Sequence, residues 1–183
     1  FDNLSSSTGI EPLIQAFYII ACIFLAIKLI ISLSKIAYLW SIGKKHRSKG
    51  YTIVELDEKP SAFSFFNLLF IHPSLINNAT IIKHELVHIK EKHSLDLLLV
   101  ECINVLCWFN PIIYFIKNDF KLLHELIADQ ETTEDQNNKH QYAMFLIESS
   151  LYNFSIPFTN QFFNQQILKQ RINMLNKEKT AKW

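Results

Sequence analysis

The stretch "IIKHELVHIKEKH", residues 81–93, decides how the rest of the chain is interpreted. On a helix, His84 and His88 project from one face one turn apart. Two imidazoles at that spacing can bind one Zn²⁺ at about 2.0–2.1 Å each. Glu85 is rotated by ~100° from His84, so its carboxylate can reach an attacking water without competing for the metal. The pattern predicts a zinc site with Glu85 as general base, provided that the chain supplies a third ligand.

The segment "LLHELIADQ", residues 122–130, offers that third ligand. Glu125 and Asp129 are four residues apart on one helix face. We expect Glu125 to bind the metal and Asp129 to accept the free ring N–H of a ligand histidine. The alternative is a pair of solvated surface acids. The metzincin continuation is excluded, because Glu91 and Ser94 stand where that class needs Gly and His.

Two further histidines fall off these helix faces. Counted along continuous helices, His93 is not on the His88 face and His124 is not on the Glu125 face, so we expect both to be ordinary polar histidines. His93 is therefore predicted to lie outside the site. His124 can still approach a substrate as an oxyanion donor, and Tyr114, Tyr142 and Arg171 compete for that role. The sequence does not choose among them.

An apolar run near the start of the chain is long enough to cross a bilayer. Residues 12–33 are interrupted only by Gln15 and Lys28, and Lys28 is close enough to one end to reach the interface. Tyr38 and Trp40 follow at the position of an interfacial aromatic belt. We expect a transmembrane helix. The alternative is a buried helix of a soluble core.

Charge predicts the orientation of that helix. The flank before it is acidic, whereas the basic residues that follow it are Lys35, Lys44, Lys45, Arg47 and Lys49. The positive-inside rule then puts residues from about 35 onward in the cytoplasm. The expected organisation is an extracytoplasmic flank, a transmembrane helix with its interface, a basic cytoplasmic linker, a zinc metallopeptidase domain and a tail, at residues 1–11, 12–40, 41–50, 51–177 and 178–183.

Composition excludes other classes. With 18 basic and 17 acidic side chains the net charge is +1, which argues against a nucleic-acid partner. The three cysteines form no CxxC pair, so we expect buried reduced thiols. The chain starts at Phe1 rather than Met, and we expect it to be a fragment or a processed product.

The remaining pattern predicts a mostly α protein with a small β-sheet. Residues 51–56 form an expected strand, and a second β-like run lies within 59–73. Residues 77–80 supply capping side chains for a helix over 79–93. An apolar helix over 95–109 follows, with Ser94 as its expected cap.

Asn110-Pro111 predicts the start of a helix that runs to about 131. Further helices are expected at 139–152 and 160–177, after a polar loop at 131–140. Residues 95–116 are long enough to cross a membrane, but a crossing would separate the ligands by roughly 30 Å. We therefore expect a helical hairpin that folds back at Asn110-Pro111 and packs in the protein or dips into the membrane.

In these features the chain resembles the BlaR/MecR-type membrane metallopeptidases, zinc enzymes of the gluzincin type. The resemblance rests on four segments, "SAFSFFNLLFIHP" (61–73), "IIKHELVHIKEKHSLD" (81–96), "WFNPIIYFIKNDFKLLHELIADQ" (108–130) and "LKQRINML" (168–175). It implies one Zn²⁺ per chain held by His84, His88 and Glu125. It also implies Glu85 as general base and Asp129 as the support of a ligand.

The resemblance further implies a substrate strand and a setting. The strand is expected within Ser61–Phe70, with Ser61, Phe63, Phe65 and Phe66 as its candidate residues. The implied partners are a protein or peptide substrate, the lipid bilayer and missing transmembrane or sensor segments. The implied location is the bacterial inner membrane with the catalytic domain facing the cytoplasm. The expected function is cleavage of a repressor, a regulator or the chain itself in signal transduction. The alternatives are a membrane quality-control or prenyl-protein-type zinc protease and a non-catalytic signalling scaffold.

Overall fold

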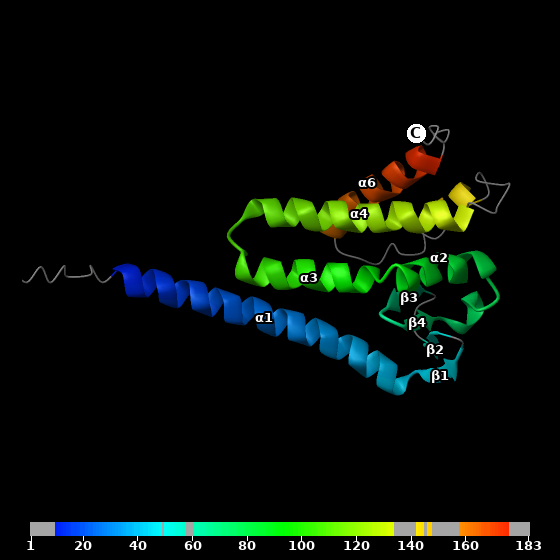
Figure 1. Ribbon diagram of the computed structural model, residues 1–183, viewed down its shortest axis with the longest axis horizontal. Coiled ribbons are helices and arrows are strands. Elements are labelled where there is room, and N and C mark those ends of the chain that lie inside the picture. Colours follow the sequence, from blue (N-terminus) through cyan, green and yellow to red (C-terminus); the bar gives the residue numbers. More distant parts are fainter. Residues whose placement is uncertain are drawn as a thin grey trace, which may run out of the picture.

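Helices make up most of the described chain, and a small sheet lies at one end (Figure 1). The computed structural model describes residues 10–48, 50–57, 61–133, 142–144, 146–147 and 158–175. Its elements are α1 (Ile10–Ile42), β1 (Lys44–Arg47), β2 (Thr52–Glu55), β3 (Ala62–Phe65), β4 (Leu68–Ile71), the short 3₁₀ helix η1 (Pro73–Leu75), α2 (Ala79–Lys90), α3 (His93–Leu106), α4 (Pro111–Thr133) and α6 (Phe158–Leu175). The expectation of a mostly α protein with a small sheet is confirmed.

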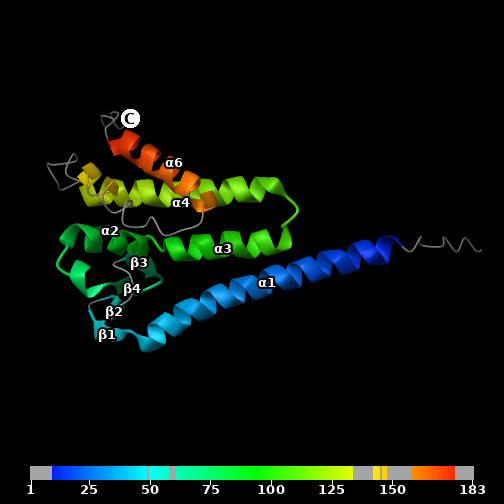
Figure 2. The same ribbon diagram turned by 180° about the vertical axis from the view of Figure 1, so that it is seen from behind.

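The predicted apolar helix is present as α1. It is the one described helix that is long and apolar enough to cross a membrane, and none of its residues is buried. Its half-buried residues recur at roughly helical spacing, and α1 contacts α3; these residues are Ala21, Cys22, Leu25, Ala26, Leu29, Leu33, Ile36 and Leu39. Figure 2 shows α1 running beside α3 and away from the rest of the molecule. The alternative of a buried core helix is therefore wrong.

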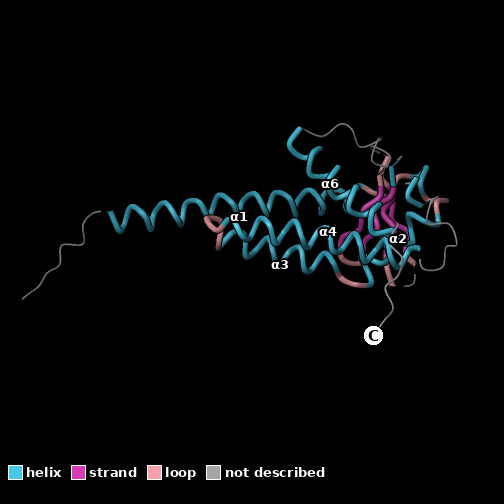
Figure 3. The backbone as a smooth tube through the Cα atoms, turned by 90° about the horizontal axis from the view of Figure 1, so that it is seen from above, coloured by secondary structure: helices cyan, strands magenta, loops and turns pink. Residues whose placement is uncertain are grey.

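The sheet is mixed and has the order β1-β2-β4-β3. β2 pairs parallel with β4, whereas β1 and β3 pair antiparallel with their neighbours. The interior of the sheet is formed by Val54, Leu69, Phe70 and Ile71, which are almost fully buried, and α2 packs against β3 and β4. Figure 3 shows the strands gathered at one end of the molecule, beside α2.

Two predictions about this region need correction. The expected linker at 41–50 is not a linker, because α1 continues to Ile42 and Lys44–Arg47 forms strand β1. Its four residues are all exposed and pair with β2 through the backbone, a role that needs no apolar side chain. The β-like run within 59–73 is two strands rather than one, because the chain turns at Phe66, whose φ is 49°.

The helix that carries the first motif begins as predicted. The Asn78 side chain accepts hydrogen bonds from the backbone N–H groups of Thr80 and Ile81 and caps α2. α2 ends at Lys90, and Lys92 adopts the left-handed conformation with φ 57° and ψ 33° before α3 begins. Ser94 is not the cap of α3. Its hydroxyl oxygen instead accepts a hydrogen bond from the backbone N–H of Phe66 at 3.0 Å.

The predicted hairpin is confirmed. α3 and α4 pack against each other and are joined at residues 107–110, and the Asn110 side chain accepts from the backbone N–H of Ile112 at the start of α4. Lys117 on α4 pairs with Glu101 on α3 at 2.5 Å. The hairpin brings the second half of α4 back against α2, so two segments that are 40 residues apart in the sequence lie side by side (Figure 1).

α6 packs on the outer side of α4, close to the expected helix at 160–177. Its last residue, Leu175, forms a small core with Tyr142, Ala143 and Leu146. Most of the expected helix at 139–152 lies outside the described residues, although 142–144 and 146–147 are helical.

Candidate metal centre

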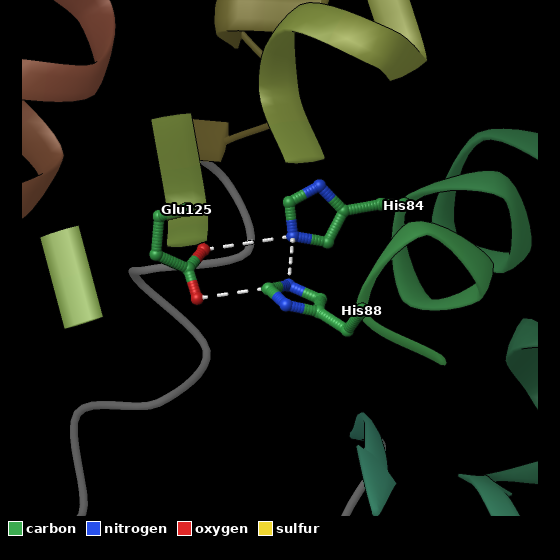
Figure 4. Close-up of side chains that lie close together, drawn as sticks. All are labelled: His84, His88 and Glu125. Atoms are coloured by element: carbon green, nitrogen blue, oxygen red, sulfur yellow. Dashed lines mark hydrogen bonds and ion pairs between the residues drawn. The ribbon is translucent and has the colours of Figure 1, made fainter. Parts of the chain in front are cut away.

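Three side chains from two helices converge where α2 crosses α4. His84 and His88 come from α2 and Glu125 from α4 (Figure 4). The His84 Nε2 atom lies 3.5 Å from Glu125 Oε2 and 3.3 Å from His88 Nε2, and His88 Nε2 lies 3.9 Å from Glu125 Oε1. One ligand atom of each residue lies within 4.8 Å of the others. Two helices thus bring together all three residues expected as ligands.

This donor set suits a metal ion. Two imidazole nitrogens and one carboxylate oxygen that face a common point are the protein ligands of catalytic zinc sites, which keep a further position open. Glu125 is half-buried, yet its charge is well compensated, because burial alone would raise its pKa but the hydrogen bond from His84 and the charge of Arg171 lower that pKa to about 2. Burial lowers the pKa of His88 to about 4. An ionised carboxylate and a neutral imidazole are the states that bind a metal.

Glu85 of α2 contacts the sheet through Ser64. Burial raises the pKa of its carboxyl group, and a hydrogen bond with Ser64 partly opposes that rise. Ser64 belongs to β3, one of the two edge strands of the sheet. The candidate general base therefore lies beside the candidate substrate strand. Ser64 was not among the residues predicted for the site, since a serine in a β-like run carries no signal of its own.

Asp129 supports the cluster and is 2% exposed. Its Oδ1 lies 3.5 Å from His84 Nδ1, as expected for a carboxylate that orients a ligand histidine. Arg171 of α6 donates to both carboxylate oxygens at 2.7 and 2.6 Å, and its Nη1 also lies 2.7 Å from Glu125 Oε2. Tyr142 donates to Asp129 Oδ1 at 2.7 Å and lies 3.0 Å from His84 Nδ1. α6 is thereby tied to the metal centre by Arg171.

The four candidates for an oxyanion donor lie in different places in the structure. Tyr114 donates to the backbone carbonyl of Trp108 at the tip of the hairpin, far along α4 from Glu125. Arg171 and Tyr142 are engaged by Asp129. His124 is 4% exposed and its Nε2 lies 3.2 Å from Asp96 Oδ2. The oxyanion role of His124 stays a prediction.

His93 was predicted to lie outside the site, and this is wrong. Its Nδ1 lies 2.7 Å from Nδ1 of His88, and its ring stacks on that of His124 at 3.9 Å between centroids. His93 is 4% exposed. The helical spacing failed because the chain is not one helix here: the left-handed residue Lys92 separates α2 from α3 and turns His93 back toward His88.

The outer edge of β3 has no strand partner among the described residues. The backbone N–H of His72 donates to the carbonyl of Ser61, which makes these two residues a hydrogen-bonded pair of the antiparallel ladder. Because such pairs alternate, Phe63 and Phe65 also bond to β4, and the backbone groups of Ala62 and Ser64 point outward. Of the candidate strand residues, Phe63 stacks on Phe70 with 4.6 Å between ring centroids.

Comparison with known proteins gives the family. A search of curated proteins found no match to this chain. The sequence model of one peptidase family, described as BlaR1 peptidase M56, matches residues 75–175. That range is more than half of the 183 residues and contains both motif helices, α2 and α4, together with α6. The expected resemblance is confirmed, and the chain belongs to the BlaR1 peptidase M56 family.

Proposed function

We propose that this chain is a membrane-embedded zinc endopeptidase of gluzincin type that cleaves a protein substrate at the cytoplasmic face during signal transduction. The observation that carries the proposal is the convergence of His84, His88 and Glu125 from two helices, with ligand atoms within 4.8 Å of one another. Membership of a peptidase family supports it. In this proposal the three residues hold one zinc ion, and Asp129 orients His84.

Glu85 is the proposed general base. When bound, the zinc ion would act as a Lewis acid toward the scissile carbonyl and lower the pKa of water. Glu85 takes a proton from the attacking water and delivers it to the leaving amine. Burial raises the pKa of Glu85 above that of an exposed glutamate, which brings the carboxyl group closer to the range in which it can both accept and return a proton.

The proposed substrate binds as an extra strand on β3. The outward backbone groups of Ala62 and Ser64 can pair with an extended peptide, and strand addition of this kind positions a backbone without reading its sequence. Ser64 also contacts Glu85. A peptide held at this edge would run past the proposed general base. The backbone N–H of Phe66, which points to the same edge, is already bonded to Ser94, so the paired length would end there.

The membrane part of the proposal rests on how the hairpin meets α1. Near its tip, the carbonyl of Leu106 accepts from the Tyr18 hydroxyl at 2.8 Å, and Val105 accepts from Cys22 at 3.4 Å. Tyr18 and Cys22 lie inside the apolar run 12–33, about 16–22 Å from its C-terminal end. If α1 spans a bilayer about 30 Å thick, the hairpin enters it from the side of the active site.

The charges of the hairpin fit that setting. Glu101 is paired with Lys117 across the two helices, and ionisable groups at membrane depth are normally paired in this way. The hairpin exposes large apolar side chains on α3, on α4 and at its tip, among them Leu99, Leu106, Phe109, Ile112 and Phe115. The basic residues after α1 favour a cytoplasmic active site.

The chemistry is tested with Glu85→Gln, measured on the full chain in detergent for bound zinc and for peptide cleavage. We expect zinc content to stay and cleavage to fall by about 10²–10⁴-fold. Glu91→Gln is the matched control, because Glu91 is an exposed glutamate at the end of the same helix. Full cleavage by Glu85→Gln, or a wild-type chain that binds no metal, would overturn the proposal. The first outcome would leave a scaffold with a structural metal.

The substrate strand is tested with two variants of one residue. Ser64→Pro removes an outward N–H, whereas Ser64→Ala keeps the N–H and removes only the hydroxyl that reaches Glu85. We expect Ser64→Pro to raise KM for an extended peptide far more than Ser64→Ala does. Equal KM values would argue against strand addition.

A proteome comparison of cells with wild type and Glu85→Gln then separates one regulatory substrate from the many substrates of a quality-control protease.

Membrane depth is tested by cysteine labelling in a background in which Cys22, Cys102 and Cys107 are Ser. Phe109→Cys at the hairpin tip should resist a water-soluble maleimide in vesicles and react in denaturant. Gln130→Cys, an exposed position at the other end of the hairpin, should react in open vesicles. Equal labelling of both positions would show that the hairpin tip is outside the membrane.

A further inference from the structure

A row of three histidines, the half-buried His88 and the buried His93 and His124, extends from the candidate metal centre toward the protein surface. His88 contacts His93, His93 stacks on His124, and His124 contacts Asp96, whose side chain is 47% exposed. The rings of His93 and His124 are almost parallel, with an interplanar angle of 14°. Such a row is unusual, because neutral histidines are intermediate in burial and buried polar groups need partners.

The atoms that face each other limit the proton positions. His88 turns Nε2 toward His84 and Glu125 and Nδ1 toward His93. If Nε2 binds the metal, its lone pair is used there, and the ring proton must be on Nδ1. That N–H then donates to Nδ1 of His93 over 2.7 Å. His93 is therefore an acceptor at Nδ1.

The stacking contact with His124 fixes the orientation of the His93 ring. His93 is held on one side by the stacked ring of His124, and His124 is itself held by Asp96 through Nε2 at 3.2 Å. A ring that cannot rotate keeps its lone pair aimed at one point. Hydrogen bonds to the non-metal nitrogen of a ligand histidine orient the ring and raise its basicity, and their loss typically weakens metal binding by 10–100-fold.

We propose that His93 is the positioning residue of His88: its Nδ1 accepts the Nδ1–H of His88 and so presents the other nitrogen of His88 to the metal, with His124 and Asp96 holding the His93 ring. Asp129 and Tyr142 have the corresponding place beside His84. Each ligand histidine thus has its own support, a carboxylate for one and an imidazole for the other. The inference rests on the proposed zinc site.

Two variants separate the acceptor from the ring. His93→Asn keeps an acceptor oxygen near the position of Nδ1 but loses the ring, whereas His93→Phe keeps a ring that can stack on His124 but has no acceptor. We expect His93→Phe to weaken zinc affinity by 10–100-fold and His93→Asn to restore it to within a few-fold of wild type. His72→Phe is the matched control, because His72 follows β4 and, in the described part of the chain, its imidazole bonds to Ser74 and to no residue of the metal centre.

The measurements are zinc affinity by competition with a chromophoric chelator and the visible spectrum of the cobalt-substituted chain, both on the full chain in detergent with its fold checked by circular dichroism. A shifted cobalt spectrum in His93→Phe, recovered in His93→Asn, supports the inference. Wild-type zinc affinity in a folded His93→Phe variant would overturn this inference and leave the proposed zinc site standing. Equal losses in both variants would assign His93 to packing instead, and a wild-type chain that binds no metal would overturn the proposed function as well.

Discussion

α1 and the second half of α4 distribute polarity in opposite ways. α1 is apolar along its length, and none of its 33 residues is buried. The buried residues of α4 are instead mostly polar, namely His124, Asp129, Thr132 and Thr133 beside Ala128. In a water-soluble protein the apolar side chains would be the buried ones and most charged ones would be exposed.

In the proposed membrane setting, this difference corresponds to two environments. An exposed apolar helix of this length is stable only where its surroundings are themselves apolar, which a bilayer provides and water does not. Buried polar side chains are stable only where they are partnered, and Asp129 has Arg171, Tyr142 and His84 around it. In that setting lipid would cover the exposed face of α1, whereas Asp129 is stabilised by its ion pair and hydrogen bonds. Four substitutions test that contrast.

The largest effect is expected at the polar interior. Asp129→Ala removes the bidentate partner of the buried Arg171 and leaves it the contact with Glu125, and breaking a buried pair from one side costs up to about 3–5 kcal/mol. Thermal unfolding in detergent, followed by circular dichroism, should show a large fall in the midpoint. Glu131→Ala is the control on α4: it removes a half-buried carboxylate that pairs with the exposed Lys90 of α2, and it should leave the midpoint unchanged. Similar midpoints for the two variants would mean that the interior pair does not hold α6.

The apolar exterior is tested next. Ile20→Lys puts a charge near the middle of the apolar run, where a lysine costs about 2.5–3.5 kcal/mol in a membrane. We expect the fraction of chain that resists alkaline extraction from membranes to fall. Ile42→Lys, at the last residue of α1, should integrate normally. Equal extraction of both variants would speak against a spanning helix.

A smaller loss of stability is expected at Gly43, the residue between α1 and β1. A Cβ at Gly43 would overlap the side chain of Val54 and lie 3.0 Å from the carbonyl oxygen of Glu55. Gly43→Ala should therefore destabilise the chain by about 1–3 kcal/mol, as overpacking does. The double variant with Val54→Ala measures the cause: if steric overlap is responsible, the two losses will be less than additive. Strictly additive losses of stability would mean that overlap with Val54 is not the cause of the destabilisation.

The smallest effect is expected where the hairpin meets α1. Tyr18→Phe removes the hydroxyl that donates to Leu106, and a hydrogen bond between membrane helices contributes about 0.6 kcal/mol. The unfolding midpoint should fall slightly, and Tyr38→Phe on the exposed end of the same helix should not change it. A loss as large as that of Asp129→Ala would show that the hairpin depends on α1 more than its contacts indicate.

The sequence predicted elements that local signals define. Asn78 and Asn110 cap their helices as expected, and Glu125 and Asp129 share a face because α4 is continuous between them. The convergence of Glu125 with the two histidines followed from the ligand geometry of zinc, which requires the hairpin to fold back. Helix-capping signals and the short distance between zinc and its ligands were sufficient to predict these helices and the convergence of the three residues.

The errors arose where tertiary contacts override local signals. Lys44–Arg47 has poor strand propensity and is a strand because the backbone of β2 is available to it. Phe66 has positive φ, which the sequence of a bulky residue does not predict. Ser94 looked like a cap, but its hydroxyl accepts from Phe66, a residue 28 positions away. His93 was misplaced by counting a helical period across Lys92, where the helix has ended.

The single residue between α1 and β1 has a mechanical consequence. Gly43 is the only residue between Ile42 and Lys44, and its backbone N–H is bonded to the carbonyl of Leu39 at 3.1 Å. A close-packed joint of this kind has no slack, so a tilt or rotation of α1 must carry β1 with it. β1 is joined through β2 and β4 to β3, the edge beside Glu85. A tilt of α1 would thus move β3, the strand proposed to bind the peptide, as part of one rigid body rather than through a flexible tether.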